Sequence, residues 1–302
     1  MRRPGCSDLR IWHNMLVLTT LQVLLALAMN ATAEPQSTVD LRARLAEIDA
    51  AGLTNYLAGL TTENLQSLQA GKSVVRIVNE ADAQNSGVGV VGLKVVQAPQ
   101  TLIWLGLITD SDELDGRFSH AILNRETHSR IVRYQHINLP WPLKDRHWVI
   151  EASSNLDIAH ASNGQIWERR WQLHDSGQLL IQPAVANGTI TAPAEERINN
   201  SIYLPANRGS WIVMRLTDNQ SLVLAFLDVR LGGIIADGLV RRFGKRELRA
   251  SLRALSDISA RVPDRYDSKL VVEDGLGQAI PLEDVLQIAC AWKPVAFATG
   301  CE

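Results

Sequence analysis

The chain has 302 residues, of which 46% are hydrophobic and 21% charged, and its formal net charge is −2. A charge this small excludes a partner held mainly by global electrostatics, so we expect no nucleic-acid ligand. The length and the aliphatic content are sufficient for one large domain with extensions.

The first 33 residues have the composition of a secretory signal peptide. Arg2, Arg3 and Arg10 precede an apolar stretch from Met15 to Met29, and Ala31-Thr32-Ala33 then supplies the small residues that signal peptidase recognises. The apolar stretch is short for a membrane span. We therefore predict export to the periplasm or secretion, with cleavage near Ala33; a retained anchor is the alternative. Cleavage would leave 27 basic and 31 acidic residues, a net charge of −4.

The cysteines agree with an oxidising compartment. Cys6 lies in the predicted signal peptide, so the mature chain would retain only Cys290 and Cys301. These two could close a short C-terminal loop through a disulfide. Spacing alone does not establish the geometry that a disulfide needs, so two free thiols remain the alternative.

Residues 34–64 are predicted to form an N-terminal helical extension, because leucines recur at three- and four-residue intervals over 38–70. Gly71 ends this region, and two strands are predicted after it, at Val74–Val78 and Val88–Val96. Pro99 then opens a short predicted helix, Gln100–Leu107.

Between about 118 and 230 the pattern changes to short runs separated by turn residues such as Asn163-Gly164 and Asn187-Gly188. Consecutive strands joined by short turns pair antiparallel, so we predict a meander. The expected strands are 119–124, 129–138, 146–153, 166–174, 178–186, 195–203, 210–217 and 221–230.

A long amphipathic helix is predicted over 234–260, ended by Pro263. Its apolar positions are Ile235, Leu239, Phe243, Leu248, Leu252 and Leu255. Its basic positions at successive i+4 steps are Arg241, Lys245, Arg249 and Arg253. The basic stripe is either the solvated face of the helix or a surface that transiently contacts anionic membrane headgroups. The tail after it is predicted to contain a short strand, Leu270–Val272, and a helix, Pro281–Ala291.

These elements predict an α+β fold in which the sheet buries its apolar face against the long helix. Two segments resemble START (steroidogenic-acute-regulatory-related lipid transfer) domains: Pro140-Trp141-Pro142-Leu143-Lys144-Asp145-Arg146-His147-Trp148-Val149 and Gly232-Gly233-Ile234-Ile235-Ala236-Asp237-Gly238-Leu239-Val240. The resemblance covers 65–262 and leaves 263–302 as a C-terminal extension. It implies a helix-grip fold, a curved antiparallel sheet around the C-terminal helix with an internal cavity, and no metal or organic cofactor.

The sequence departs from the family pattern at informative places. His147 stands where the family usually has Asp, and Ala236 replaces a common Pro. Some family members have an acid–base pair inside the cavity, and ungapped counting from Trp148 places Ile137 and Ala152 at those positions. We therefore expect a more apolar cavity, without that ion pair.

Strand alternation and the resemblance together predict the face that lines the cavity. The predicted ligand-binding residues are Trp148, Ile150, Trp167, Arg169, Trp171, Leu224, Phe226, Ile235, Leu239 and Phe243. The alternative is that these side chains fill a solid core. Arg169, between Trp167 and Trp171 on one strand face, could bind a ligand hydroxyl or carboxylate inside the cavity, or stack on the indole rings at the surface.

Motifs of nucleophilic, zinc, redox and phosphate-binding sites are missing: G-x-S-x-G, H-E-x-x-H, C-x-x-C and the Walker loop. We therefore predict a non-enzymatic carrier or sensor of a sterol, hopanoid, fatty acid or phospholipid. One alternative is a cyclase-like or hydrolase-like enzyme on the same scaffold, with His136, Arg169 or Tyr203 as its candidate residues. Another is an interaction module whose cavity is filled by Trp148 and Trp171.

Overall fold

The computed structural model describes residues 40–50, 57, 59–78, 88–109, 118–127, 130–233, 237–265 and 272–292. From Leu41 onward the chain forms one compact unit. The predicted signal peptide lies outside the described residues. Among the helices that are described, none combines the length and the apolar composition needed to cross a membrane.

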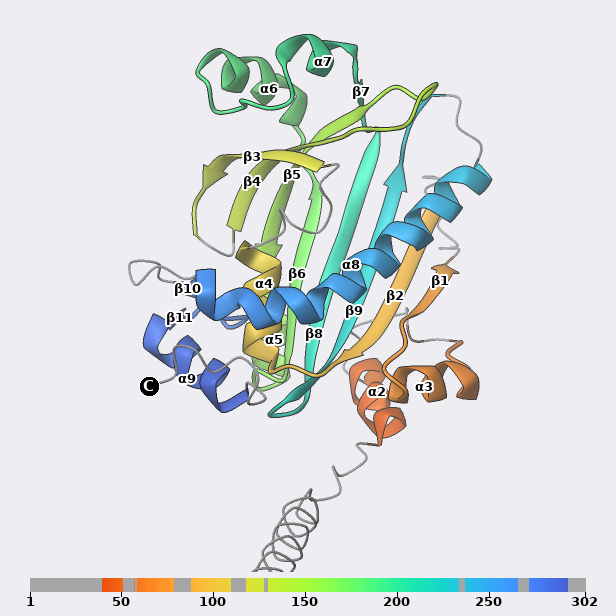
Figure 1. Ribbon diagram of the computed structural model, residues 1–302, viewed down its shortest axis with the longest axis vertical. Helices are drawn as coiled ribbons and strands as arrows, with labels where there is room; N and C mark the ends of the chain where they lie inside the picture. Colours follow the sequence, from red (N-terminus) through yellow and green to blue (C-terminus); the bar gives the residue numbers. More distant parts are fainter. Residues whose placement is uncertain are drawn as a thin grey trace, which may run out of the picture. The chain divides into compact units, whose positions relative to one another are not determined.

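One sheet of nine strands forms the centre of this unit (Figure 1). Its strands are β1 (Val74–Val78), β2 (Val88–Val96), β3 (Phe118–Arg125), β4 (Arg130–Ile137), β5 (Arg146–Ser154), β6 (Ile166–Leu173), β7 (Ile202–Tyr203), β8 (Ala206–Thr217) and β9 (Gln220–Arg230). Eight of them follow the order β1-β2-β9-β8-β6-β5-β4-β3, and β7 pairs with β5. Neighbours along this path are antiparallel. The predicted meander is therefore confirmed for β3, β4, β5, β6, β8 and β9, whereas β7 pairs parallel with β5.

Eight helices are described: α2 (Leu41–Ala50), α3 (Thr62–Gln69), α4 (Gln100–Thr109), α5 (Leu156–Ala161), α6 (Gly177–Ala186), α7 (Glu195–Asn200), α8 (Asp237–Arg265) and α9 (Leu282–Trp292). A second, small sheet pairs β10 (Val272–Glu273) with β11 (Ala279–Ile280). Figure 1 shows α8 crossing the sheet obliquely, and it contacts β2 and α4. The long helix on a curved antiparallel sheet confirms the predicted helix-grip α+β fold.

Two of the expected strands are wrong. The run 178–186 forms α6, in which Ile181 and Ala184, three positions apart, are buried while Leu179 is exposed. The run 195–203 forms α7 followed by the two-residue strand β7. Apolar residues in a short run fit a strand or one turn of helix equally well, and only the packing partner decides between them.

Several helix boundaries also differ from those expected. The predicted helical region 38–70 contains two helices, and α3 begins with a capping box in which Thr61 and Asn64 exchange hydrogen bonds. The long helix continues through Pro263 to Arg265. Residues 64–65 lie inside α3 and residues 262–263 inside α8, so neither predicted domain boundary coincides with the end of an element.

Two glycines let α8 approach its neighbours closely. A β-carbon at Gly92 in β2 would lie 2.8 Å from Leu252 Cδ1 and 2.9 Å from Leu248 Cγ. A β-carbon at Gly106 in α4 would lie 2.6 Å from Ile258 Cγ2. The apolar side of α8 thus packs into a dense core at these two positions, where an added methyl group would overlap existing atoms.

The two segments that resemble START domains meet at Arg146, which is 2% exposed. Its Nε donates to the carbonyl oxygen of Leu231 at 2.5 Å, and its Nη2 donates to that of Gly232 at 2.9 Å. Gly232 and Gly233 have φ values of 67° and 72°, a region that glycine adopts without strain. Arg146 therefore fixes the beginning of β5 to the segment that leads into α8.

His147 lies on the face of β4 and β5 that packs against α6 and α7. The rings of Tyr134 and Tyr203 pack edge to face on its imidazole ring. The ring centroid of His147 lies 6.0 Å from that of Tyr134 and 5.5 Å from that of Tyr203. Burial, together with repulsion from His136, lowers the pKa of His147 from 6.5 to about 4. Its Nδ1 is buried without a hydrogen-bond partner among the described residues.

This burial predicts a loss of stability in mild acid. Between pH 6.5 and about 4 the unfolded chain binds a proton at His147 that the folded chain does not, so stability falls as the pH falls through this window. The shift corresponds to about 3 kcal/mol. We expect His147→Phe, which keeps the ring contacts, to lose less stability between pH 7 and pH 4.5 in urea unfolding. His160→Phe, at an exposed position of α5, is the control, and an unchanged pH dependence in His147→Phe would contradict the prediction.

Candidate ligand-binding cavity

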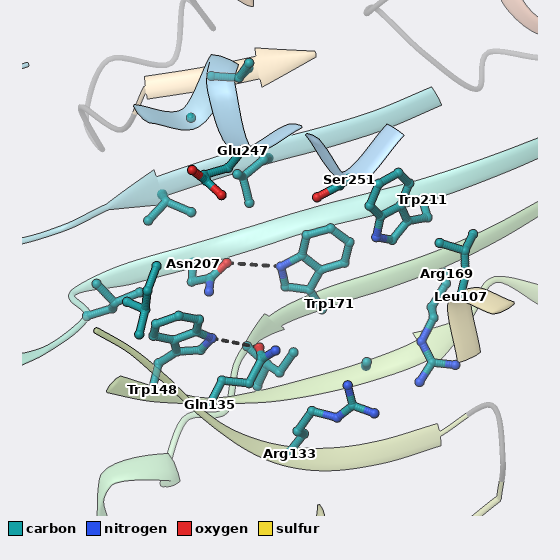
Figure 2. Close-up of a pocket in the computed structure, with 18 of the residues that line it drawn as sticks. Leu107, Arg133, Gln135, Trp148, Arg169, Trp171, Asn207, Trp211, Glu247 and Ser251 are labelled. Atoms are coloured by element: carbon teal, nitrogen blue, oxygen red, sulfur yellow. Dashed lines mark hydrogen bonds between the residues drawn. The ribbon is translucent and has the colours of Figure 1, made fainter. Parts of the chain in front are cut away.

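A cavity of about 250 Å³ lies between the concave face of the sheet and α8 (Figure 2). Its walls are built mainly from alternate residues of β4, β5 and β6, with contributions from β8, β9 and α8. Because side chains alternate along a strand, each of these strands gives every second residue to the cavity. Most of the wall is aliphatic or aromatic.

Four of the predicted ligand-binding residues line the cavity: Trp148 and Ile150 from β5, and Arg169 and Trp171 from β6. Ile137 and Ala152, which ungapped counting assigned to the acid–base pair of some START domains, also line it. The wall is apolar at these two positions, but it is not free of charge. Arg133, Arg169 and Glu247 contribute charged groups from positions other than that pair.

Three tryptophans, Trp148, Trp171 and Trp211, line the cavity, and hydrogen bonds hold the indole rings of the first two. Trp148 Nε1 donates to Gln135 Oε1 at 2.9 Å, and Trp171 Nε1 donates to Asn207 Oδ1 at 3.0 Å (Figure 2). The Trp171 ring lies over Gly209, where a β-carbon would overlap it. The rings therefore form part of the wall, and the cavity between them contradicts the hypothesis of an interior filled by Trp148 and Trp171.

Three other predicted residues lie elsewhere. Trp167 shares its face with Arg169 and Trp171 but packs edge to face on Trp104 of α4, at a centroid distance of 5.7 Å. Leu224 and Phe226 are buried on the opposite face of the sheet, so their assignment to the cavity is wrong. The cavity side of β9 carries Leu227 and Val229. Alternation groups the residues of a strand correctly but does not say which group faces inward.

The expected helix residues of the cavity are not tested by the structure. Ile235 lies outside the described residues, as do the side chains of Leu239 and Phe243. Among the described residues of α8, Gly244, Glu247 and Ser251 line the cavity. Their spacing of three and four residues places them on one helix face, and a search for apolar residues alone passes over them.

Arg169 is inside the protein, which excludes the interpretation that it stacks on tryptophans at the surface. It is 5% exposed, and its Nη1 has no hydrogen-bond partner among the described residues. Burial, with repulsion from Arg133 and Arg125, lowers the pKa of Arg169 to about 9. Arg133, 6% exposed, lines the same cavity from β4. Arg133 was not among the predicted site residues. It pairs with Ile150 in the β4–β5 register, so the two side chains lie on the same face of the sheet.

The other residues considered for catalysis, His136 and Tyr203, do not line the cavity. His136 Nε2 lies 3.1 Å from Ser201 Oγ and 3.6 Å from Asp145 Oδ2, so both contacts use the same ring nitrogen. A Ser-His-Asp relay needs one contact at each nitrogen. Tyr203 Oη accepts a hydrogen bond from the amide of Val149 at 3.3 Å. Across the part of the chain that is described, no group of three or more His, Cys, Asp or Glu residues is placed to hold a metal ion.

Cys290, exposed on α9, is disulfide-bonded, so the free-thiol alternative is wrong for this residue. Cys301 lies outside the described residues. The pairing of Cys290 with Cys301 stays a prediction.

Comparison with models of protein families and with curated proteins finds no match. Among solved structures, the chain is similar to human StAR-related lipid transfer protein 5, with 12% identity, 72% of this chain and 96% of that chain covered, and a TM-score of 0.46. It is also similar to a STAR-related lipid transfer protein from Xanthomonas axonopodis, with 14% identity, 62% and 93% coverage, and a TM-score of 0.46. The Zhui aromatase/cyclase from Streptomyces sp. R1128 has 13% identity, 62% and 95% coverage, and a TM-score of 0.39.

At these identities and TM-scores the likeness concerns the arrangement of the elements only. The START-like helix-grip fold of this chain rests on its own strand order and on α8, which lies across the sheet.

Proposed function

We propose that this protein is an exported lipid-binding protein that holds an apolar ligand in the cavity between the sheet and α8, as a carrier or sensor. The observation that supports the proposal most directly is the cavity itself, whose wall is largely apolar and includes two fixed indole rings. Small-molecule sites combine such walls with a few polar groups. Transfer of the ligand from water would be driven by burial of apolar area, about 25 cal/mol per Å².

The size of the cavity narrows the ligand class. Its volume of about 250 Å³ lies just below the range of roughly 300–1,000 Å³ that is usual for a ligand pocket. Of the four ligand classes predicted from the sequence, a sterol, a hopanoid and a two-chain phospholipid are all larger than this. A single-chain ligand such as a fatty acid fits best.

An enzymatic role on the same scaffold is the second candidate, because Arg133, Arg169 and Glu247 bring charge to the cavity wall. General acid–base catalysis works best with a pKa near the working pH, and the pKa of Arg169, about 9, is above neutrality. A ligand recovered chemically changed after incubation with the protein would favour the enzyme, and one recovered intact would favour the carrier.

Filling the cavity is expected to abolish ligand binding. Ala152 lines the cavity, so Ala152→Phe places a ring in the space that the ligand would occupy. Ser153→Phe, the next residue on the opposite face of β5, is the matched control. Titration with a fluorescent single-chain fatty acid should show at least a roughly tenfold weaker affinity in Ala152→Phe only, because the ring removes the apolar contact area. Equal affinities in both variants would contradict the location of the site.

The ligand class can be tested independently by organic extraction of the protein purified from its native cells, followed by mass spectrometry. We expect a co-purifying single-chain lipid. The absence of any lipid in the extract, together with no binding of any lipid class in titrations, would overturn the proposed function.

Export is expected to remove residues 1–33. Expression of the full chain in a host with a secretory pathway should give a mature protein outside the cytoplasm whose N-terminal sequence begins near Glu34. Ala33→Arg should block cleavage, because signal peptidase needs small residues there. A protein that keeps Met1 and fractionates with the membrane would instead support a retained anchor.

Ligand exchange is proposed to involve transient contact with a membrane surface through Arg241, Lys245, Arg249 and Arg253 of α8. Of these, Arg249 and Arg253 are exposed and Lys245 is half-buried, while the side chain of Arg241 lies outside the described residues. Trp141, 92% exposed in the β4–β5 loop, supplies an apolar group that suits a membrane interface.

Removing two of these charges should weaken binding to anionic vesicles. Each exposed Arg near such a surface contributes ~1 kcal/mol, so Arg249→Gln with Arg253→Gln should weaken co-sedimentation roughly 30-fold. Arg215→Gln, an exposed arginine at the end of β8, is the control. Equal binding to neutral vesicles, or no effect of the double variant, would contradict a role for the stripe.

A further inference from the structure

Arg169 is a buried cation whose bonding is incomplete. The residue is only 5% exposed, and its Nη1 is buried with no hydrogen-bond partner among the described residues. It lines the cavity in the region of Leu107 and Trp211 (Figure 2). An unpaired buried charge is costly, and buried charges in proteins are normally paired or bound to a ligand.

Arg133 brings a second cation to the same end of the cavity. The two guanidinium groups lie on the same side of the cavity in Figure 2, and repulsion from Arg133 contributes to the lowered pKa of Arg169. With a pKa of about 9, Arg169 still carries its charge at neutral pH. This end of the cavity therefore has a positive potential inside an otherwise apolar wall.

The cavity wall offers Arg169 no carboxylate at this end. Among the described residues that line the cavity, Glu247 is the one acid, and Figure 2 shows it on α8, on the side away from both arginines. The nearby acid on β6, Glu168, lies on the opposite face of the strand and binds Asn155 at 2.6 Å and Arg170 at 2.8 Å. No described residue supplies a negative group that completes the bonding of Arg169, and a ligand in the cavity could supply one.

We propose, building on the proposed function, that Arg169 and Arg133 form an anion subsite and that the ligand is a single-chain carboxylic acid bound with its carboxylate at this subsite. A guanidinium group matches a carboxylate with two parallel hydrogen bonds. From the arginines the cavity continues along Ile150 and Trp171 toward Ile137 and Trp148, a largely apolar path for the chain. The volume of about 250 Å³ suits a medium-length chain.

The test compares two ligands that differ only in the head group. Binding of decanoate and of 1-decanol is measured by calorimetry on the wild-type protein, Arg169→Met, Arg133→Met and the control Arg170→Met. Arg170 is adjacent on β6, but its side chain is 55% exposed and bonded to Glu168. We expect decanoate to bind more tightly than decanol, and this preference to fall about 10- to 100-fold in Arg169→Met and to fall also in Arg133→Met. Arg170→Met should keep it.

Because each variant is compared with itself on two ligands, a general loss of folded protein cancels in the ratio. Equal binding of decanoate and decanol by the wild type would overturn the anion subsite and leave the proposed function standing. Binding of neither ligand, nor of any other lipid, would overturn the proposed function itself.

The free energy of unfolding, measured with a chemical denaturant and without ligand, distinguishes a structural role of Arg169 from a role in ligand binding. If Arg169 serves ligand binding, Arg169→Met removes an incompletely bonded charge and the protein should be at least as stable as the wild type. A destabilised Arg169→Met would show that the guanidinium supports the fold, and it would overturn the proposal.

Discussion

The packing of α8 against β2 at Gly92 is the contact on which the interior of this protein depends. The helix lies so close to the strand that a β-carbon at Gly92 would come within 2.9 Å of both Leu248 and Leu252. On this side of α8 the interior is dense and apolar. The adjacent side presents Gly244, Glu247 and Ser251 across from β4, β5 and β6, and the cavity lies there. One side of α8 therefore packs densely into the core, and the adjacent side forms a wall of the cavity.

Arg146 gives the two START-like segments a common physical basis. Its guanidinium group binds carbonyl oxygens of Leu231 and Gly232 and also that of Lys144. The carbonyls of Leu231 and Gly232 are available because Gly232 and Gly233 take left-handed backbone angles that leave the chain outside a regular strand or helix. A buried arginine at the start of β5 and a glycine pair before α8 are thus two halves of one hydrogen-bonded junction. This explains why they can be recognised together although they lie far apart in the sequence.

The sequence predicted the sheet well where the interactions are local. The antiparallel order of β3, β4, β5, β6, β8 and β9 was predicted, and alternation placed Trp148 with Ile150 and Arg169 with Trp171. Short turns join only part of this meander, because α5 lies between β5 and β6, and α6 and α7 lie between β6 and β8. The prediction failed where contacts with residues distant in the sequence determine the type of element or the face that is buried. Residues 178–186 became a helix because Tyr134 and Val149 offer a surface to Ile181 and Ala184. Leu224 and Phe226 were assigned to the wrong face because both faces of β9 are buried, so their hydrophobicity carries no directional signal.

Some polar residues of the cavity wall have their hydrogen bonds completed by other wall residues, and Arg169 does not. This difference distinguishes residues that stabilise the wall from a residue that can bind a ligand. Gln135 and Asn207 use their amide oxygens to bind the indoles of Trp148 and Trp171, so they complete the wall. Arg169 is buried more deeply than either, but part of its hydrogen-bonding capacity is unused among the described residues. A satisfied polar group in a core rigidifies it, whereas a charged group left incomplete lowers stability without improving packing. A fold that needed only an apolar interior would be better served by methionine at this position. The unpaired guanidinium is therefore most simply understood as one half of an interaction whose other half arrives with the ligand.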